Sequence, residues 1–83
     1  MNEIFLIGKV ITDIKFDFII NSKKHISISE FTVETLNKQE IRIVAYDDIA
    51  DFCYSKFNKD DMVVINGKIR NDNIEIYNIE KYF

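Results

Sequence analysis

The sequence of 83 residues contains no proline, only two glycines and a single cysteine. One cysteine cannot form an internal disulfide, so a hydrophobic core must hold the fold together, as is usual in a reducing compartment. No segment approaches the roughly 18 apolar residues that a membrane-spanning helix needs. The first residues also lack the basic start and the small-residue cleavage site of a signal peptide. These absences predict a cytoplasmic protein with no membrane partner.

Positive charge is also scarce, because 11 lysines and arginines face 14 aspartates and glutamates, for a net charge of −3. Tight binding to nucleic-acid phosphates without sequence preference needs a positively charged groove. The net negative charge therefore counts against such binding. Hydrophobic residues make up 47% of the chain, which is a globular composition rather than a disordered one. We expect residues 1–83 to form one domain, at the small end of what folds alone.

Alternation of apolar and polar residues predicts five strands. The first covers residues 2–20, with Gly8 marking a bend or bulge inside it. In its second half Phe16 and Phe18 share an apolar face, which favours a place in the core. The other strands are expected over residues 25–35, 40–46, 62–70 and 74–83. In the second strand the apolar positions change phase, which predicts a bulge near Ser29–Glu30.

One segment breaks the alternation. Within residues 47–57 the apolar positions follow helical spacing, which predicts a helix with Phe52 and Phe57 buried and Cys53 as a small buried hydrophobe. Asp47 and Asp48 stand where an N-cap residue is needed, and binding of a divalent cation is the weaker alternative for them.

The order of elements is therefore strand, strand, strand, helix, strand, strand. Five strands remove their edges best by coiling into a partly open barrel, and a single helix can cover its open end. The fold class expected is all-β: a five-stranded OB-fold Greek-key barrel with one helix between strands 3 and 4.

At this point the sequence resembles a known family. "MNEIFLIGKVITDIKF" is similar to the opening of the bacterial single-stranded DNA-binding proteins, and "IRIVAYDDIADFCYSKFNKDDMVVINGKIR" is similar to their second half. That family stacks bases on aromatic side chains and tracks phosphates with lysine and arginine. The resemblance implies a base-stacking role for Tyr46 and, at or next to commonly basic positions, phosphate contacts from Arg42, Lys59, Lys68 and Arg70.

The resemblance also implies partners. Single-stranded DNA is the expected ligand, with RNA as an alternative. A homodimer or homotetramer is expected to form through "NEIFLIG", with Ile4 and Leu6 at the interface. Because β-propensity alone explains an exposed strand tyrosine, Tyr46 could equally be a plain surface residue on the sequence alone. Lys68 and Arg70 could likewise be a solvated strand face, and Tyr77 could extend the stacking platform.

Several positions depart from the family's pattern. There is no tryptophan, and Glu40 and Ile74 stand where relatives have stacking aromatics. Asp47–Asp48 replace a Gly-Lys pair, and the sequence stops at "EKYF" without the usual acidic tail. The prediction is a divergent, tail-less member that binds single strands weakly and without sequence preference. The alternative is an OB-fold protein-interaction or assembly module that has lost nucleic-acid binding.

Nothing in the sequence predicts an enzyme. His25 is the only histidine and has no neighbouring cysteine, histidine or carboxylate motif, so it is a weak candidate for a ligand or base. No nucleophile is placed with a base. We therefore expect no catalytic residue, no cofactor, no metal and no small-molecule substrate.

Overall fold

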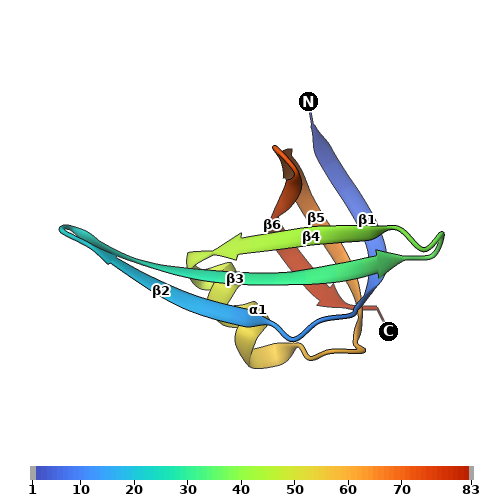
Figure 1. Cartoon of the computed structure of the whole chain (residues 1–83), viewed down its shortest axis with the longest axis horizontal. Coiled ribbons are helices and arrows are strands. Elements are labelled where there is room, and N and C mark those ends of the chain that lie inside the picture. Colours follow the sequence, from blue (N-terminus) through green and yellow to red (C-terminus); the bar gives the residue numbers. More distant parts are fainter. Residues whose placement is uncertain (1, 83) are drawn as a thin grey trace.

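The computed structural model describes residues 2–82, apart from the side chain of Asn21, so that Met1 and Phe83 of the expected domain lie outside it. It contains six strands and one helix, coloured along the chain in Figure 1. In chain order these are β1 (Glu3–Val10), β2 (Lys15–Asn21), β3 (Lys24–Thr35), β4 (Glu40–Tyr46), α1 (Asp47–Lys56), β5 (Met62–Arg70) and β6 (Asn73–Lys81).

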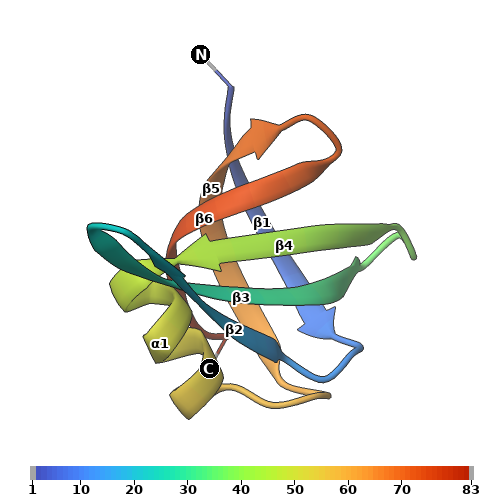
Figure 2. The same ribbon diagram turned by 60° about the vertical axis from the view of Figure 1, so that its left-hand side comes forward.

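The strands form one sheet in the order β1-β5-β6-β4-β3-β2, which closes into a barrel because β1 also pairs with β3. Figure 2 shows the strands wrapped around the core with α1 packed beneath β3 and β4. The expected OB-fold is confirmed. The expected first strand is divided in two, because β1 pairs with β5 whereas β2 pairs only with β3. The helix consequently follows the fourth of six strands.

Gly8 lies where β1 changes partners. It is the Cα partner of Val63 in β5 and of Thr35 in β3 at once. A Cβ atom at this position would lie 2.9 Å from the carbonyl oxygen of Glu34. A glycine is needed here because the two backbones approach too closely for any side chain, while the β1–β5 register continues without a bulge through Lys9.

The bulge expected near Ser29–Glu30 is wrong. The β3–β4 register runs without a break from Ile28 opposite Tyr46 to Glu34 opposite Glu40. Ser29 faces inward and is fully buried, and its Oγ donates a hydrogen bond to the carbonyl oxygen of Ala50 in α1 at 2.7 Å. A small polar residue occupies this inward position because the helix packs directly against β3. The alternation of apolar and polar residues therefore changes phase in the sequence, although the strand itself continues without a bulge.

The helix buries a narrower face than its apolar residues suggest. Ala50, Cys53 and Phe57 are buried, whereas Phe52 is 41% exposed and meets the ring of Phe57 edge-on with centroids 5.6 Å apart. The expected burial of Phe57 and Cys53 is confirmed, and that of Phe52 is wrong. Burial raises the pKa of Cys53 to about 12, which keeps the thiol protonated.

The start of α1 also differs from expectation. Tyr46 is the N-cap residue, with extended backbone angles and no side-chain capping hydrogen bond, and the helix begins at Asp47. The expected capping by Asp47 and Asp48 is therefore wrong. Both acids lie in the first turn, where they interact favourably with the helix dipole, and Asp47 adopts a left-handed φ of 57°.

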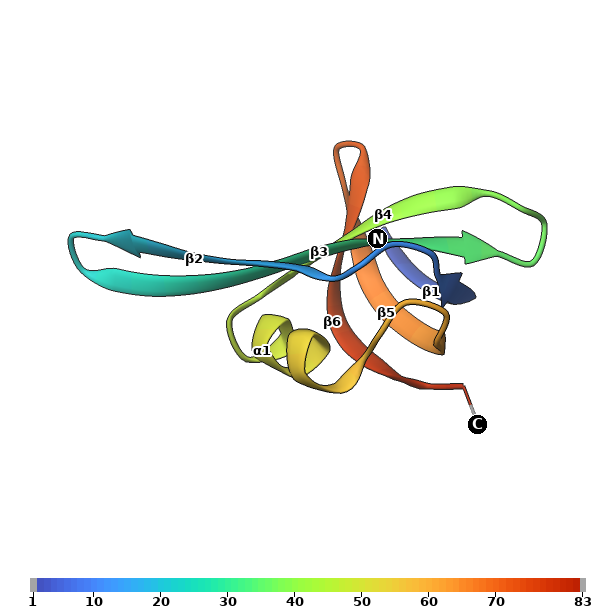
Figure 3. The same cartoon turned by 60° about the horizontal axis from the view of Figure 1, so that its bottom comes forward.

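The hairpin of β2 and β3 projects beyond the barrel (Figures 1 and 3). We call residues 15–28 of this hairpin the arm, and the part of it beyond the Ile28–Tyr46 pair has no partner in β4. Phe16 and Phe18 are 38% and 48% exposed, so the expectation that they belong to the core is wrong. Phe16 stacks on Tyr54 of α1 with ring centroids 4.8 Å apart, and Phe18 meets His25 edge-on. Their shared apolar face was read correctly, but the arm carries that face away from the barrel.

Candidate nucleic-acid interface

Two of the expected site residues lie on one face of β4. Ile41, Ile43 and Ala45 turn inward along this strand, so alternation turns Arg42 and Tyr46 outward, and both are exposed. Tyr46 is 39% exposed and is the Cα partner of Ile28 on β3. We call the outward side of β3, β4, β5 and β6 the outer face.

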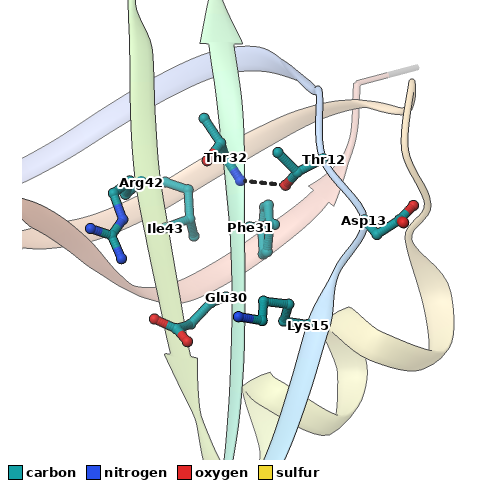
Figure 4. Close-up of a pocket in the computed structure, with 8 residues that line it drawn as sticks. All are labelled: Thr12, Asp13, Lys15, Glu30, Phe31, Thr32, Arg42 and Ile43. Atoms are coloured by element: carbon teal, nitrogen blue, oxygen red, sulfur yellow. Dashed lines mark hydrogen bonds between the residues drawn. The ribbon is translucent and has the colours of Figure 1, made fainter.

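Arg42 separates two shallow hollows on this face. The first, of about 310 Å³, is drawn in Figure 4 and brings Lys15, Glu30 and Arg42 together with Thr12, Asp13 and Thr32. The Oγ1 atom of Thr12 accepts a hydrogen bond from the backbone N–H of Thr32 at 3.0 Å, which holds the β1–β2 connection against β3. Lys15 therefore lines the same hollow as Arg42, although no role was predicted for it from the sequence.

The second hollow, of about 360 Å³, lies between the start of β4 and the β5–β6 turn. Its lining includes Glu40, Arg42, Asp72 and Ile74. Glu40 and Ile74 are the positions that the resemblance aligns with stacking aromatics. Ile74 is only 4% exposed, so it packs in the core and offers no platform for a base.

Lys68 and Arg70 lie on the outer face of β5, with β6 between them and β4. Glu75 of β6 is the Cα partner of both Lys68 and Val44. It also accepts a hydrogen bond from Nε of Arg70 at 3.0 Å. On the other side, Lys68 is the Cα partner of Glu3. The structure places these cations on the same face as Arg42, with carboxylates interleaved among them.

Tyr77 is the residue of β6 left without a Cα partner at the bulge, because Asn66 pairs with Asn78 and Gly67 with Ile76. The side chain is 45% exposed. Desolvation, together with a hydrogen bond to the nearby Glu3 carboxylate, raises the pKa of Tyr77. The phenol thus stays neutral, and its ring is held near β1 at the margin of the outer face.

The remaining expected residues lie elsewhere. Lys59 belongs to the connection between α1 and β5 and lines a separate hollow with Asp13 and Tyr54, away from Arg42 and Lys68. Leu6 is buried in the barrel core, and Ile4 packs against it half-buried. A contact of these two side chains with a second copy stays a prediction.

Within the part of the chain that the structure describes, no group of three or more histidine, cysteine or acidic residues could hold a metal ion. Among the same residues, no helix is long and apolar enough to cross a membrane.

Comparison with known proteins identifies the fold. Neither a protein-family model nor a curated protein sequence matches this chain. Among solved structures, the single-stranded DNA-binding domain of a Synechococcus protein matches with a TM-score of 0.85 and 16% identity, over 96% of this chain and 94% of that one. The single-stranded DNA-binding protein of Thermus aquaticus matches with a TM-score of 0.74 and 17% identity. This chain is covered completely and spans 41% of the Thermus chain. The chain therefore has the OB-fold found in single-stranded DNA-binding domains.

Proposed function

We propose that this protein binds single-stranded DNA through the outer face, weakly and without sequence preference. The observation that carries the proposal is that Arg42 and Tyr46 share the outward side of β4, with Val44 between them. In OB-folds, oligonucleotides bind on the face of the second and third barrel strands, which correspond here to β3 and β4. An arginine and an exposed ring on one strand face supply the two contacts that sequence-tolerant binding needs, one to phosphate and one to the face of a base.

Weak binding follows from what surrounds this pair. Tyr46 is one platform, whereas the aligned positions Glu40 and Ile74 provide none. Each missing base–aromatic stack removes about 1–3 kcal/mol. In addition, Arg70 forms an ion pair with Glu75, which weakens its attraction for phosphate. The cations left to contact phosphate are chiefly Arg42, Lys15 and Lys68.

The test is binding of fluorescent oligo-dT, followed by anisotropy across a salt titration. Two or three phosphate contacts at roughly 0.7 each give an expected log–log slope of about −1.4 to −2. Tyr46→Ala should lower the affinity by ~1–3 kcal/mol for every base composition alike, because each base has a face that can stack. Tyr54→Ala is the control, since that tyrosine is also exposed, at 57% against 39% for Tyr46, but lies on α1. Equal losses for the two variants would contradict the proposed site.

The second candidate function, an OB-fold assembly module without nucleic-acid binding, is favoured by one observation. Carboxylates interrupt the row of cations on the outer face, with Glu3 and Glu75 on either side of Lys68. Glu75→Gln separates the two functions, because it releases Arg70. It should tighten oligo-dT binding several-fold, whereas Glu80→Gln, which removes the same charge beside Phe52 and Lys56, should not. If neither the wild type nor Glu75→Gln binds at about 50 mM salt, the assembly function is correct.

A further inference from the structure

The outer edge of β2 is open. Among the described strands, β2 pairs only with β3, in a regular register over all seven residues from Lys15 to Asn21. Natural sheets usually protect such an edge with proline, a bulge or several charged residues. The segment "KFDFIIN" contains no proline and no glycine, and its only charged residues are Lys15 at its start and Asp17.

One hydrogen bond shows which backbone groups face this edge. The N–H of Phe18 donates to Oδ1 of its neighbour Asp17 at 3.0 Å. It therefore does not take part in the ladder with β3. Because N–H and C=O groups alternate in direction along an antiparallel strand, Phe16 and Ile20 also turn theirs to the open edge.

The side chains of the same three residues form an apolar stripe. Phe16, Phe18 and Ile20 share one face of the arm and are 38%, 48% and 67% exposed. Figure 3 shows the far part of the arm extending clear of the barrel, where the outer edge of β2 has no neighbouring strand. An open backbone edge beside an exposed apolar stripe is the arrangement that a further strand completes.

We propose that β2 is a strand-addition site whose occupant is β2 of a second copy of this chain, antiparallel about a two-fold axis at Phe18. Phe18 is the middle residue of Lys15–Asn21, so this register uses the entire strand. A two-fold axis perpendicular to the sheet keeps the apolar stripes of the two copies on the same side. Phe16 then lies opposite Ile20 of the second copy, and the two Phe18 residues lie opposite each other.

The charges favour the same register. It places Lys15 opposite Asn21 and Asp17 opposite Ile19 of the second copy, so no like charges are directly paired. A register shifted to a centre at Asp17 would instead pair the two Asp17 carboxylates directly, which is destabilising. In the proposed register they lie on a diagonal, at a distance of roughly 7–8 Å.

Asp17 regulates this pairing. Its carboxylate accepts the hydrogen bond from the Phe18 N–H, which the second strand would need as a donor. This hydrogen bond must break before the two strands can pair. Asp17→Asn lowers both this competition and the diagonal repulsion. It should therefore strengthen self-association several-fold, whereas Phe18→Lys, which puts a charge at the centre of the stripe, should abolish pairing at this edge.

Cysteine cross-linking tests the register directly. In a Cys53→Ala background, Phe18→Cys should form a disulfide-linked dimer under mild oxidation, since directly paired residues have Cα atoms about 5.5 Å apart, within disulfide range. Phe16→Cys and Ile20→Cys should each remain uncrosslinked alone and cross-link with each other when mixed. Leu36→Cys, 81% exposed in the β3–β4 turn, measures random collision.

The result that supports the proposal is this selective pattern, together with a higher association constant for Asp17→Asn in sedimentation equilibrium. The proposal is wrong if Phe18→Cys cross-links no more than Leu36→Cys, or if the three β2 cysteines cross-link indiscriminately. Both readouts are made without nucleic acid, so they stand apart from oligo-dT binding. Circular dichroism of each variant confirms that the fold is intact before cross-linking is interpreted.

Discussion

At the scale of single residues, Phe52 in α1 and Phe57 at its C-cap form a matched pair. Phe57 is 4% exposed and Phe52 is 41% exposed. Phe57→Ala should lower the free energy of unfolding by ~3–5 kcal/mol, because it leaves a cavity against the barrel. Phe52→Ala should cost less than about 1 kcal/mol, as a half-exposed side chain does. Urea denaturation of the two variants measures both values, and equal losses would show that α1 buries a different face.

Helical spacing placed Phe57 and Cys53 correctly in the core but could not exclude Phe52. The three residues lie within two turns, and about 100° separates Phe52 from Cys53 around the helix axis. Which side of the stripe faces the barrel depends on how close α1 comes to β3. That approach is set by Ser29 and its bond to Ala50, a contact between residues 21 apart in the sequence. The local pattern contains no information on it.

At the scale of elements, the bulge between β5 and β6 depends on Gly67. A Cβ atom there would lie 2.6 Å from the carbonyl oxygen of Glu75 and 2.9 Å from Cγ2 of Ile74. Gly67→Ala should therefore destabilise the protein by ~1–3 kcal/mol, because backbone atoms must move. The urea midpoint measures this, with Asn66→Ala on the adjacent outward position as the control. An unchanged midpoint for Gly67→Ala would mean that the two strands separate at little cost.

The strands themselves were predictable from alternation, whereas their partners were not. Residues 2–20 read as one strand because both halves are apolar and only Gly8 interrupts them. The structure divides them because β1 bonds to β5, which begins at Met62, while β2 bonds to the neighbouring β3. Alternation also placed three cations on exposed strand faces from the sequence alone, namely Arg42, Lys68 and Arg70. The acid between them, Glu75, became visible only with the sheet order.

At the scale of the whole molecule, β1 offers a second open edge. Residues 3–7 pair with β5 on one side, and pairing with β3 on the other side begins only at Gly8. We propose, as the resemblance implies, that this edge also joins two copies. Two different two-fold interfaces on one chain can close into a tetramer. Light scattering should then give a tetramer for the wild type and a dimer for Phe18→Lys. A mass of 9.8 kDa for the wild type at high micromolar concentration would contradict both interfaces.

The closure of the barrel by β1 has a consequence for the order of folding. Ile4 is the Cα partner of Gly67, whereas β2 and β3 meet across a turn of two residues. Loop-closure entropy favours the short connections, so the hairpin of β2 and β3 can form while β1 still has no partner. Folding of such non-local strand pairings is slow, on the order of milliseconds to seconds. During synthesis, residues 3–7 of β1 must therefore wait for their partner until β5 has been made, and their apolar side chains stay in water for that interval.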